Sequence, residues 1–295
     1  MKDKIVLFRA NSSSTIGTGH IMRDLVLASK YEKNGYTIVF VTQNLNGNIN
    51  DKILSYNYKV EIVKDNTLKP FQSIIDKYKP KIIVIDSYDI NYTFEKELKN
   101  QNQNIKLLCF DDTYEKHYCD ILLNHNIYAN KEKYKNLVNK NCKLKCGSKY
   151  TLLRYEFKIE KQKNRNKKYN FLIAMGGADT ANLNTIILKV LLKMNKKCKI
   201  AVVTTNANKN IDKLKLFCKR FDNVDLKINS SKIAKLLNQT KLAIITPSVI
   251  ANEISFLSTP FVAIKTASNQ KYMYKYLKDN NHVVLKKFRK HKWKI

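Results

Sequence analysis

Two short segments combine residue types that could bind a phosphorylated ligand and act on it. The first, residues 11–20 (NSSSTIGTGH), places hydroxyl side chains before two glycines and a histidine. Gly17 and Gly19 allow the backbone to turn tightly and to approach a ligand closely. The hydroxyls of Ser14 and Thr15 can donate hydrogen bonds, and the helix that we expect next offers free N–H groups to an anion. A tight strand-to-helix turn without a ligand would need the same glycines, so a purely structural role for Gly17 and Gly19 is the alternative to ligand binding.

His20 closes this segment and is the residue best suited to proton transfer. An imidazole has an ordinary pKa of about 6.5 and can accept a proton near neutral pH. Because His20 begins a helix directly after a glycine loop, we do not expect it to lie in a core. A purely local hydrogen bond at the helix start is the alternative. The remaining histidines lack such a setting and are expected to be structural: His117, His125, His282 and His291.

The second segment is residues 175–179 (MGGAD), in which Gly176 and Gly177 stand between an expected strand and an expected helix. A diphosphate could sit there, because the helix dipole favours negative charge at its N-terminus. The segment lacks the GxxxxGK[ST] pattern of ATP-binding loops and the full GxGxxG of dinucleotide-binding folds. We therefore disfavour ATPases and NAD enzymes, and we expect no cofactor.

A third polar segment, residues 246–253 (TPSVIANE), follows a strand and opens a helix. It presents Ser248 and Asn252, and the carboxylate of Glu253 could bridge the two hydroxyls of a ribose. An ordinary glutamate near a helix start, favoured by the helix dipole, is the alternative. Two further side chains could face the same ligand, Asn269 after the last strand and Arg154 as a partner for phosphate.

The elements that position these residues alternate between apolar strands and amphipathic helices, which is typical of parallel α/β folds. We expect strands over 4–9, 37–42, 58–63, 81–86, 105–110, 120–123, 169–174, 199–204, 224–228, 242–246 and 260–264, and helices over 20–34 and 181–194. The pattern restarts after the basic run 158–168 (KIEKQKNRNKK), which we interpret as a linker. The sequence thus predicts two Rossmann-like domains, 1–155 and 168–295, with a ligand cleft between them.

The charge balance favours an anionic small substrate. The chain has 295 residues, and 55 Lys and Arg against 24 Asp and Glu give a net charge of +31. A basic surface also suits nucleic acid. However, the lysines are spread along the whole chain and accompany no known nucleic-acid-binding signature. We expect no nucleic-acid partner.

Targeting and metal signals are weak. No apolar run reaches the roughly 20 residues of a membrane-spanning helix, and the N-terminus does not resemble a signal peptide. The six cysteines form no CxxC pair, so we expect structural thiols and no metal site. These features predict a cytoplasmic protein, which we expect to be a monomer.

Taken together, the motifs resemble one enzyme family. The opening run 8–14 (FRANSSS), then 16–20 (IGTGH) and 23–25 (RDL), is similar to the start of the UDP-2,4-diacetamido-2,4,6-trideoxy-β-L-altropyranose hydrolases of pseudaminic acid synthesis, the PseG family. The similarity continues in order through 86–88 (DSY), 110–112 (FDD), 119–124 (CDILLN), 146–147, 153–154, 175–177 and 252–253. The glycine pair and the Asn-Glu pair are shared more widely, notably with the glycosyltransferase MurG.

The resemblance implies a GT-B fold of two Rossmann-like domains and hydrolysis of a UDP-sugar at its anomeric carbon with inversion. It implies that His20 is the base that activates water, and that Tyr88 and Asn269 lie near the sugar. Arg154 and Glu253 are expected near the nucleotide-sugar. The resemblance also implies a place in the pathway that serves flagellin glycosylation.

One departure and two rival functions remain. The chain has Asn11 where the family has Asp, which predicts altered hydrogen bonding in the first loop, and its Lys-rich tail, 286–295, has no assigned role. A MurG-like glycosyltransferase would transfer the sugar to an acceptor instead of water. A nucleotide-sugar binding protein without catalysis would leave His20 without a task.

Overall fold

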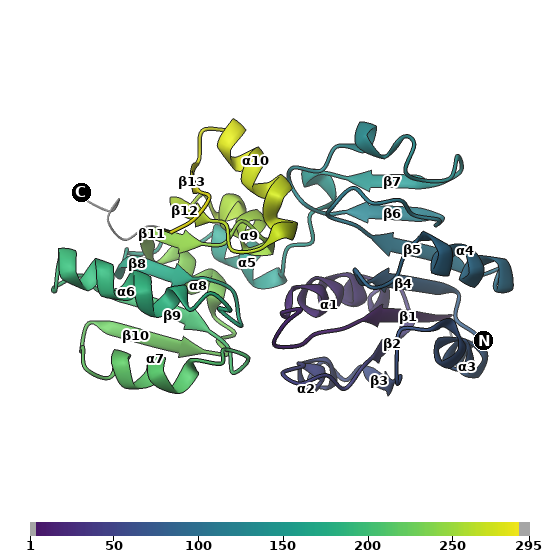
Figure 1. The fold of residues 1–295 in the computed structure, drawn as a ribbon, viewed down its shortest axis with the longest axis horizontal. Coiled ribbons are helices and arrows are strands. Elements are labelled where there is room, and N and C mark those ends of the chain that lie inside the picture. Colours follow the sequence, from purple (N-terminus) through teal and green to yellow (C-terminus); the bar gives the residue numbers. More distant parts are fainter. Residues whose placement is uncertain (1–3, 289–295) are drawn as a thin grey trace. The chain divides into compact units, whose positions relative to one another are not determined.

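The computed structural model describes residues 4–288, so His291 and most of the Lys-rich tail lie outside the described residues. The chain divides into two compact units, Met1–Leu152 and Leu153–Ile295. Each unit is built around one parallel sheet with helices packed on it (Figure 1). No helix within residues 4–288 is long and apolar enough to cross a membrane.

The first unit contains a seven-stranded sheet in the order β3-β2-β1-β4-β5-β6-β7. All its paired strands run parallel. The strands are β1 (Lys4–Ala10), β2 (Tyr36–Thr42), β3 (Lys59–Ile62), β4 (Ile82–Asp86), β5 (Lys106–Phe110), β6 (Ile121–Asn124) and β7 (Lys143–Cys146). The central strands β4 and β5 are apolar apart from Asp86 at the end of β4 and Lys106 at the start of β5, because both faces of the sheet are covered.

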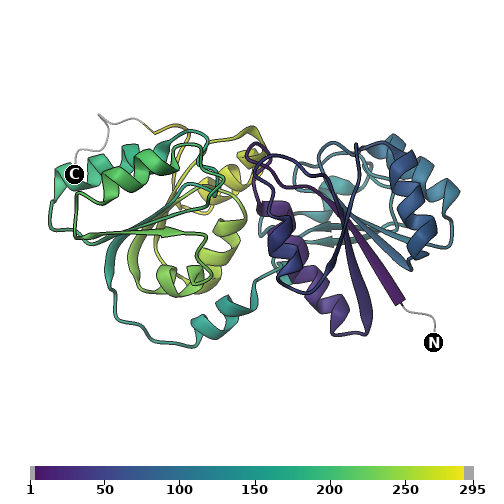
Figure 2. The ribbon, with the colours of Figure 1, turned by 90° about the horizontal axis from the view of Figure 1, so that it is seen from below.

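Helices cover both faces of this sheet (Figure 2). The side chains of α1 and α2 pack with Phe8 and Val84 on one face, and those of α3 and α4 pack with Leu7 and Ile83 on the other. The alternation of neighbouring strand residues between the two cores follows from the period of two in a strand. The helices are α1 (Gly19–Glu32), α2 (Asn50–Leu54), α3 (Leu68–Tyr78) and α4 (Tyr92–Gln101), with 3-10 turns η1 (Lys131–Tyr134) and η2 (Ser148–Tyr150).

The second unit contains a six-stranded parallel sheet in the order β10-β9-β8-β11-β12-β13. Its strands are β8 (Tyr169–Ala174), β9 (Ile200–Thr204), β10 (Val224–Ile228), β11 (Thr240–Ile245), β12 (Phe261–Ile264) and β13 (Val283–Leu285). Its helices are α5 (Tyr155–Lys161), α6 (Leu183–Met194), α7 (Ile211–Cys218), α8 (Ile233–Asn238), α9 (Val249–Leu257) and α10 (Lys271–Asp279), with the 3-10 turn η3 (Ser268–Gln270). Helices α6 and α7 pack on one core of the sheet, and α5, α8 and α9 pack against one another.

The predicted α/β class and the eleven predicted strands are confirmed, with ends that differ by one or two residues. Two strands were missed. Strand β7 (KLKC) and strand β13 (VVL) are edge strands that are short and partly exposed, so they lack the long apolar run by which the others were recognised. The expected linker, 158–168, instead begins within helix α5 and belongs to the second unit.

Candidate active site

In the first unit, the predicted catalytic histidine lies at the carboxyl edge of the sheet. His20 follows β1 and stands in the first turn of α1, because the loop between them reverses tightly at Gly17, whose φ is +84°. Gly17 N–H donates to the Ser13 carbonyl at 2.8 Å. Strands β1, β4 and β5 are neighbours in the sheet, so the residues that follow them meet at this edge.

The His20 ring is buried, with 7% of its surface exposed, contrary to the expectation that it would lie outside the core. Its Nδ1 lies 2.9 Å from Asp86 Oδ1 and 3.0 Å from the Asp86 carbonyl oxygen. The ring of Tyr88 meets it edge-on, with centroids 4.8 Å apart. Burial is compatible with function here because the carboxylate of Asp86, the last residue of β4, compensates the charge of the imidazolium.

Asp86 is in turn fixed by Arg23. The Arg23 guanidinium donates from Nε to Asp86 Oδ2 at 2.6 Å and from Nη2 to Oδ1 at 2.5 Å. Its Nη1 donates to Asp112 Oδ2 at 3.0 Å, and the Tyr88 hydroxyl donates to Asp112 Oδ1 at 2.8 Å. A bidentate pair of this kind is strong and geometrically specific. Side chains from α1 and from the ends of β4 and β5 therefore form one connected network around His20.

The electrostatics of this network favour a basic histidine. Burial on its own opposes the imidazolium, but the Asp86 carboxylate outweighs it and raises the pKa of His20 above 6.5. Burial also opposes an ionised Asp86, yet Arg23 and His20 hold the pKa of Asp86 far below its usual range. Asp24 is fully buried, and burial together with the neighbouring Asp86 carboxylate raises its pKa well above the usual range.

Arg23, Asp86 and Asp112 belong to the motifs shared with the family, but the sequence predicted no role for them. A signal was present, since Asp86 ends an otherwise apolar strand and Asp112 comes two residues after another. Charged residues at the carboxyl ends of buried parallel strands are placed where ligands bind.

The hydroxyl residues of the first loop serve mainly to shape it. Ser14 N–H donates to the Asn46 carbonyl at 3.0 Å, and the hydroxyls of Ser13 and Thr15 lie 2.9 Å apart. Asn11, the departure from the family pattern, accepts from Arg9 at 2.9 Å and donates to Gln43 at 2.8 Å. Its amide thus ties the loop to β1 and to the end of β2.

In the second unit, the glycine segment follows β8 as expected, and Gly176 adopts a φ of +87°. Its helix N-terminus is not free, however. Asp179 accepts from Leu183 N at 2.8 Å and from Asn184 N at 2.9 Å, which caps α6 with a carboxylate. An anion at this segment would therefore depend on the glycine N–H groups more than on those of α6.

The predicted nucleotide residues Arg154 and Glu253 contact each other within the second unit. Arg154 donates from Nε to Glu253 Oε1 at 2.7 Å and from Nη2 to Oε2 at 2.9 Å. Glu253 and Asn252 are buried in the first half of α9. Since both carboxylate oxygens accept from Arg154, a ribose hydroxyl at Glu253 would share these oxygens with the guanidinium.

The other two predicted residues of this unit lie beside neighbouring strands. Ser248 is the N-cap of α9 after β11, with its hydroxyl 3.0 Å from that of Thr246. Asn269 is exposed in η3 after β12. Strands β8, β11 and β12 are adjacent, so the polar residues predicted here share one carboxyl edge, as those of the first unit do.

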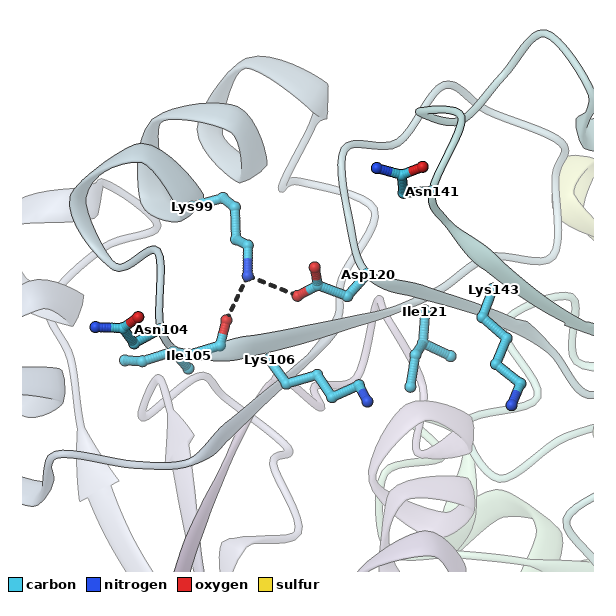
Figure 3. Close-up of a pocket in the computed structure, with 8 residues that line it drawn as sticks. All are labelled: Lys99, Asn104, Ile105, Lys106, Asp120, Ile121, Asn141 and Lys143. Atoms are coloured by element: carbon cyan, nitrogen blue, oxygen red, sulfur yellow. Dashed lines mark hydrogen bonds and ion pairs between the residues drawn. The ribbon is translucent and has the colours of Figure 1, made fainter.

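A hollow of about 400 Å³ lies elsewhere (Figure 3). It is lined by residues at the amino ends of β5, β6 and β7, including Lys106, Ile121 and Lys143. Within it, Lys99 donates to Asp120 Oδ2 at 2.7 Å and to the Ile105 carbonyl at 2.6 Å. It is thus at the opposite edge of the sheet from His20 and contains none of the predicted site residues.

Solved structures place both units in one class of fold. The chain matches MurG of Acinetobacter baumannii with a TM-score of 0.58 at 12% identity, covering 95% of this chain and 85% of that one. It matches the spinosyn forosaminyltransferase SpnP with a TM-score of 0.63 at 9% identity, covering 98% and 88%. The architecture is that of GT-B glycosyltransferases, as the sequence predicted.

Sequence comparison is more specific. The chain is 39% identical over 265 residues to a UDP-2,4-diacetamido-2,4,6-trideoxy-β-L-altropyranose hydrolase of Campylobacter jejuni, covering 90% of this chain and 93% of that protein. It is also 31% identical to an uncharacterized protein of Methanocaldococcus jannaschii, covering 90% of this chain and 56% of that protein. No family model matches the chain. The chain belongs to the family of these UDP-sugar hydrolases, which confirms the predicted resemblance.

Proposed function

We propose that the chain hydrolyses UDP-2,4-diacetamido-2,4,6-trideoxy-β-L-altropyranose to UDP and the free diacetamido sugar. Its 39% identity to a hydrolase of this substrate supports the reaction. The observation that carries the mechanism is the buried contact of 2.9 Å between His20 Nδ1 and Asp86 Oδ1. An imidazole held by a carboxylate through one nitrogen is a general base at the other.

The proposed chemistry follows from this arrangement. His20 Nε2 removes a proton from water while the water oxygen attacks the anomeric carbon on the face opposite UDP. The bond from that carbon to the β-phosphate oxygen breaks, and its electron pair leaves with UDP, so the configuration inverts. UDP is a good leaving group, and the reaction needs no strong acid. General-base help of this kind contributes roughly 10²–10⁴-fold.

The remaining predicted residues take the roles of binding groups in this proposal. Tyr88, which is exposed at the ring edge of His20, contacts the sugar, and Asn269 does the same from the second unit. The glycines of 176–177 donate to the diphosphate. Arg154 and Glu253 bind as a pair, with the guanidinium facing phosphate and the carboxylate facing ribose. Ser14, Thr15, Gly17, Gly19, Ser248 and Asn252 line the substrate.

The biological setting is part of the same proposal. The free sugar is an intermediate of pseudaminic acid synthesis, which supplies flagellin glycosylation, and the enzyme acts as a cytoplasmic monomer without nucleic acid. Support comes from the name of the Campylobacter jejuni relative for the sugar and from the dispersed lysines for the absence of nucleic acid.

A direct test is to incubate the chain with the UDP-sugar, a chelator and no acceptor, and to follow the products by NMR. We expect UDP and a free sugar whose first-formed anomer is inverted. A MurG-like transferase, suggested by the shared fold, would release UDP only after an acceptor was added. A panel of UDP-diacetamido sugars then identifies the substrate by its kcat/KM.

A further inference from the structure

The carboxylate of Asp112 joins Tyr88, which the proposed function places at the sugar, to the arginine that holds Asp86. The Tyr88 hydroxyl donates to Asp112 Oδ1 at 2.8 Å and lies 3.0 Å from its Oδ2. Arg23 Nη1 donates to the same Oδ2 at 3.0 Å. Arg23 also binds Asp86, which in turn binds His20. The His20 ring meets that of Tyr88 edge-on, so these contacts close into a ring of five side chains.

The backbone around Asp112 is fixed by its neighbours. The Asp111 carboxylate accepts from Thr113 N at 2.9 Å and from Tyr114 N at 2.7 Å, which shapes the turn after β5. The Tyr128 hydroxyl donates to the Asp112 carbonyl, and the Asp112 side chain is only 14% exposed. A carboxylate held in this way sets the direction of the hydroxyl that it binds.

The contact with Asp112 decides how the Tyr88 hydroxyl can bond to a ligand. A phenol has one proton to donate, and an ionised carboxylate can only accept. Two side chains that bind this carboxylate, Tyr88 and Arg23, are both donors, as an acceptor-only group requires. Since Asp112 takes the phenolic proton, Tyr88 is left to accept a hydrogen bond from a sugar and cannot donate one.

We propose that Asp112 is a positioning residue, which fixes the Tyr88 hydroxyl as the acceptor of a hydrogen bond from an N–H or O–H of the sugar. The inference rests on the proposed function, in which Tyr88 contacts the sugar beside His20. The diacetamido sugar of that reaction offers such donors, namely the N–H groups at C2 and C4 and the hydroxyl at C3. A sugar with only acceptors at this place would meet the phenolic oxygen with no proton between them, so the contact selects for a donor.

Asp112→Asn reverses this polarity with little change of shape. The amide oxygen can still accept from Arg23, while the amide N–H faces the Tyr88 hydroxyl and donates to it, which turns the phenolic proton toward the sugar. Asp112→Asn should therefore lower kcat/KM about 10-fold, which corresponds to the loss of one hydrogen bond. In Tyr88→Phe, which lacks that bond already, the same change should lower kcat/KM less than about 2-fold.

A double-mutant cycle of Asp112→Asn and Tyr88→Phe separates this role from a structural one. Equal losses from Asp112→Asn in the unaltered chain and in Tyr88→Phe would mean that Asp112 acts through Arg23 or through the fold, and would overturn the inference. Full activity of Asp112→Asn would overturn it too. Tyr58→Phe is the matched control, since the Tyr58 hydroxyl donates to a carboxylate, Glu32 Oε2, at 2.9 Å beside the amino end of β3. This control should keep full kcat/KM.

Substrate analogues identify the donor without any change at Asp112, so they serve even if Asp112→Asn does not fold. Each analogue removes one donor, by an ester oxygen in place of the N–H at C2 or at C4, or by hydrogen in place of the hydroxyl at C3. We expect one analogue to lose about 10-fold in kcat/KM with the unaltered chain, and less than about 2-fold with Tyr88→Phe. If every analogue loses as much with Tyr88→Phe as with the unaltered chain, Tyr88 accepts no bond from the sugar and the inference is overturned.

Failure of the proposed function is distinguishable from failure of this inference. An unaltered chain that binds the UDP-sugar without releasing UDP contradicts the hydrolase function alone, and one that does not bind it overturns both. Where only binding is found, the same cycle is measured as Kd for the UDP-sugar by calorimetry. Losses of affinity from Asp112→Asn that vanish in Tyr88→Phe support the inference, and losses that are equal in both backgrounds overturn it.

Discussion

The imidazole of His20 and the carboxylate of Asp86 form a buried contact of 2.9 Å between Nδ1 and Oδ1, although the two residues are 66 positions apart in the chain. The same carboxylate receives two hydrogen bonds from Arg23. Asp86 therefore orients the ring and sets its basicity, so the histidine can be tested both by its removal and by its titration.

Replacing the imidazole should remove the base and leave ligand binding intact. For His20→Ala we expect kcat to fall roughly 10²–10⁴-fold, with the affinity for UDP changed little, because UDP is assigned to residues of the second unit. Release of UDP from the UDP-sugar measures kcat, and calorimetry measures UDP affinity. His282→Ala, an exposed histidine of the second unit, is the matched control and should keep full activity. Retained turnover in folded His20→Ala would remove this residue from the mechanism.

The acidic limb of the pH profile of kcat/KM should depend on Asp86, because Asp86 raises the pKa of His20. A general base must be neutral, and the pKa of His20 is raised above 6.5 by Asp86 against the opposing effect of burial. Activity should thus fall as the pH drops through a value above 6.5. In Asp86→Asn the carboxylate charge is gone, so the acidic limb should move to lower pH and the plateau should be lower.

Asp112→Asn is the control for that measurement. Asp112 also raises the pKa of His20, but it comes last among the causes, so its removal should move the limb less than that of Asp86. Because Asp86→Asn leaves the buried Arg23 without its main partner, circular dichroism must accompany the profile. An unmoved acidic limb in a folded Asp86→Asn variant would contradict the proposed pairing.

Binding of the nucleotide should depend on Arg154. Its bidentate bonds to Glu253 make the pair a rigid group, and hydrogen bonds to charged partners contribute about 1.5–3 kcal/mol. Arg154→Lys keeps the positive charge but removes the planar guanidinium that makes two parallel hydrogen bonds. We expect KM for the UDP-sugar to rise about 10- to 100-fold, with a smaller change in kcat. Steady-state kinetics test this.

A control for Arg154 is available in the same helical segment. Lys161 in α5 donates to Ser258 Oγ at 2.7 Å on the surface, and Lys161→Ala should leave KM unchanged. If Arg154→Lys also leaves KM unchanged while retaining its Tm, the pair has a structural role in the second unit and does not bind substrate.

The strands of the fold were predictable from the sequence, but the side-chain pairings of the candidate site were not. Long apolar runs predicted all the strands except β7 and β13, because burial on both faces of a sheet leaves a continuous apolar pattern, whereas β7, with its alternating lysines, has too weak a pattern. Because the strands were predicted correctly, the polar loops that follow them were also located. The contacts between side chains of different loops were not predictable, since Arg154 and Glu253 lie 99 positions apart and nothing in either segment specifies the other.

The state of His20 was misjudged for a related reason. Its position after a glycine loop predicted exposure, but burial depends on what the neighbouring strands contribute, and Asp86 and Tyr88 close over it from the end of β4. The cap formed by Asp179 was also missed. Asp179 accepts from N–H groups four and five positions later, whereas an ordinary N-cap side chain reaches two or three positions ahead, so the sequence alone did not identify it as a cap.

The Asp179 cap makes a prediction about stability. Burial raises the pKa of this carboxyl from its ordinary 3.8 to about 6, even though two helix N–H groups favour the ion. A folded pKa above the unfolded one means that the folded state binds the proton more tightly, so this group's contribution to stability is present in full below pH 3.8 and is lost as the pH rises through about 6.

Asp179→Asn removes the titration and keeps an oxygen that can accept from Leu183. We expect the Tm of Asp179→Asn minus that of the unaltered chain to increase between pH 4 and pH 7, as measured by thermal denaturation. Asp179→Ala, which loses both capping bonds, should cost about 0.5–2 kcal/mol relative to Asp179→Asn at every pH. A difference in Tm that stays flat with pH would mean that Asp179 is ionised throughout and that its capping bonds outweigh its burial.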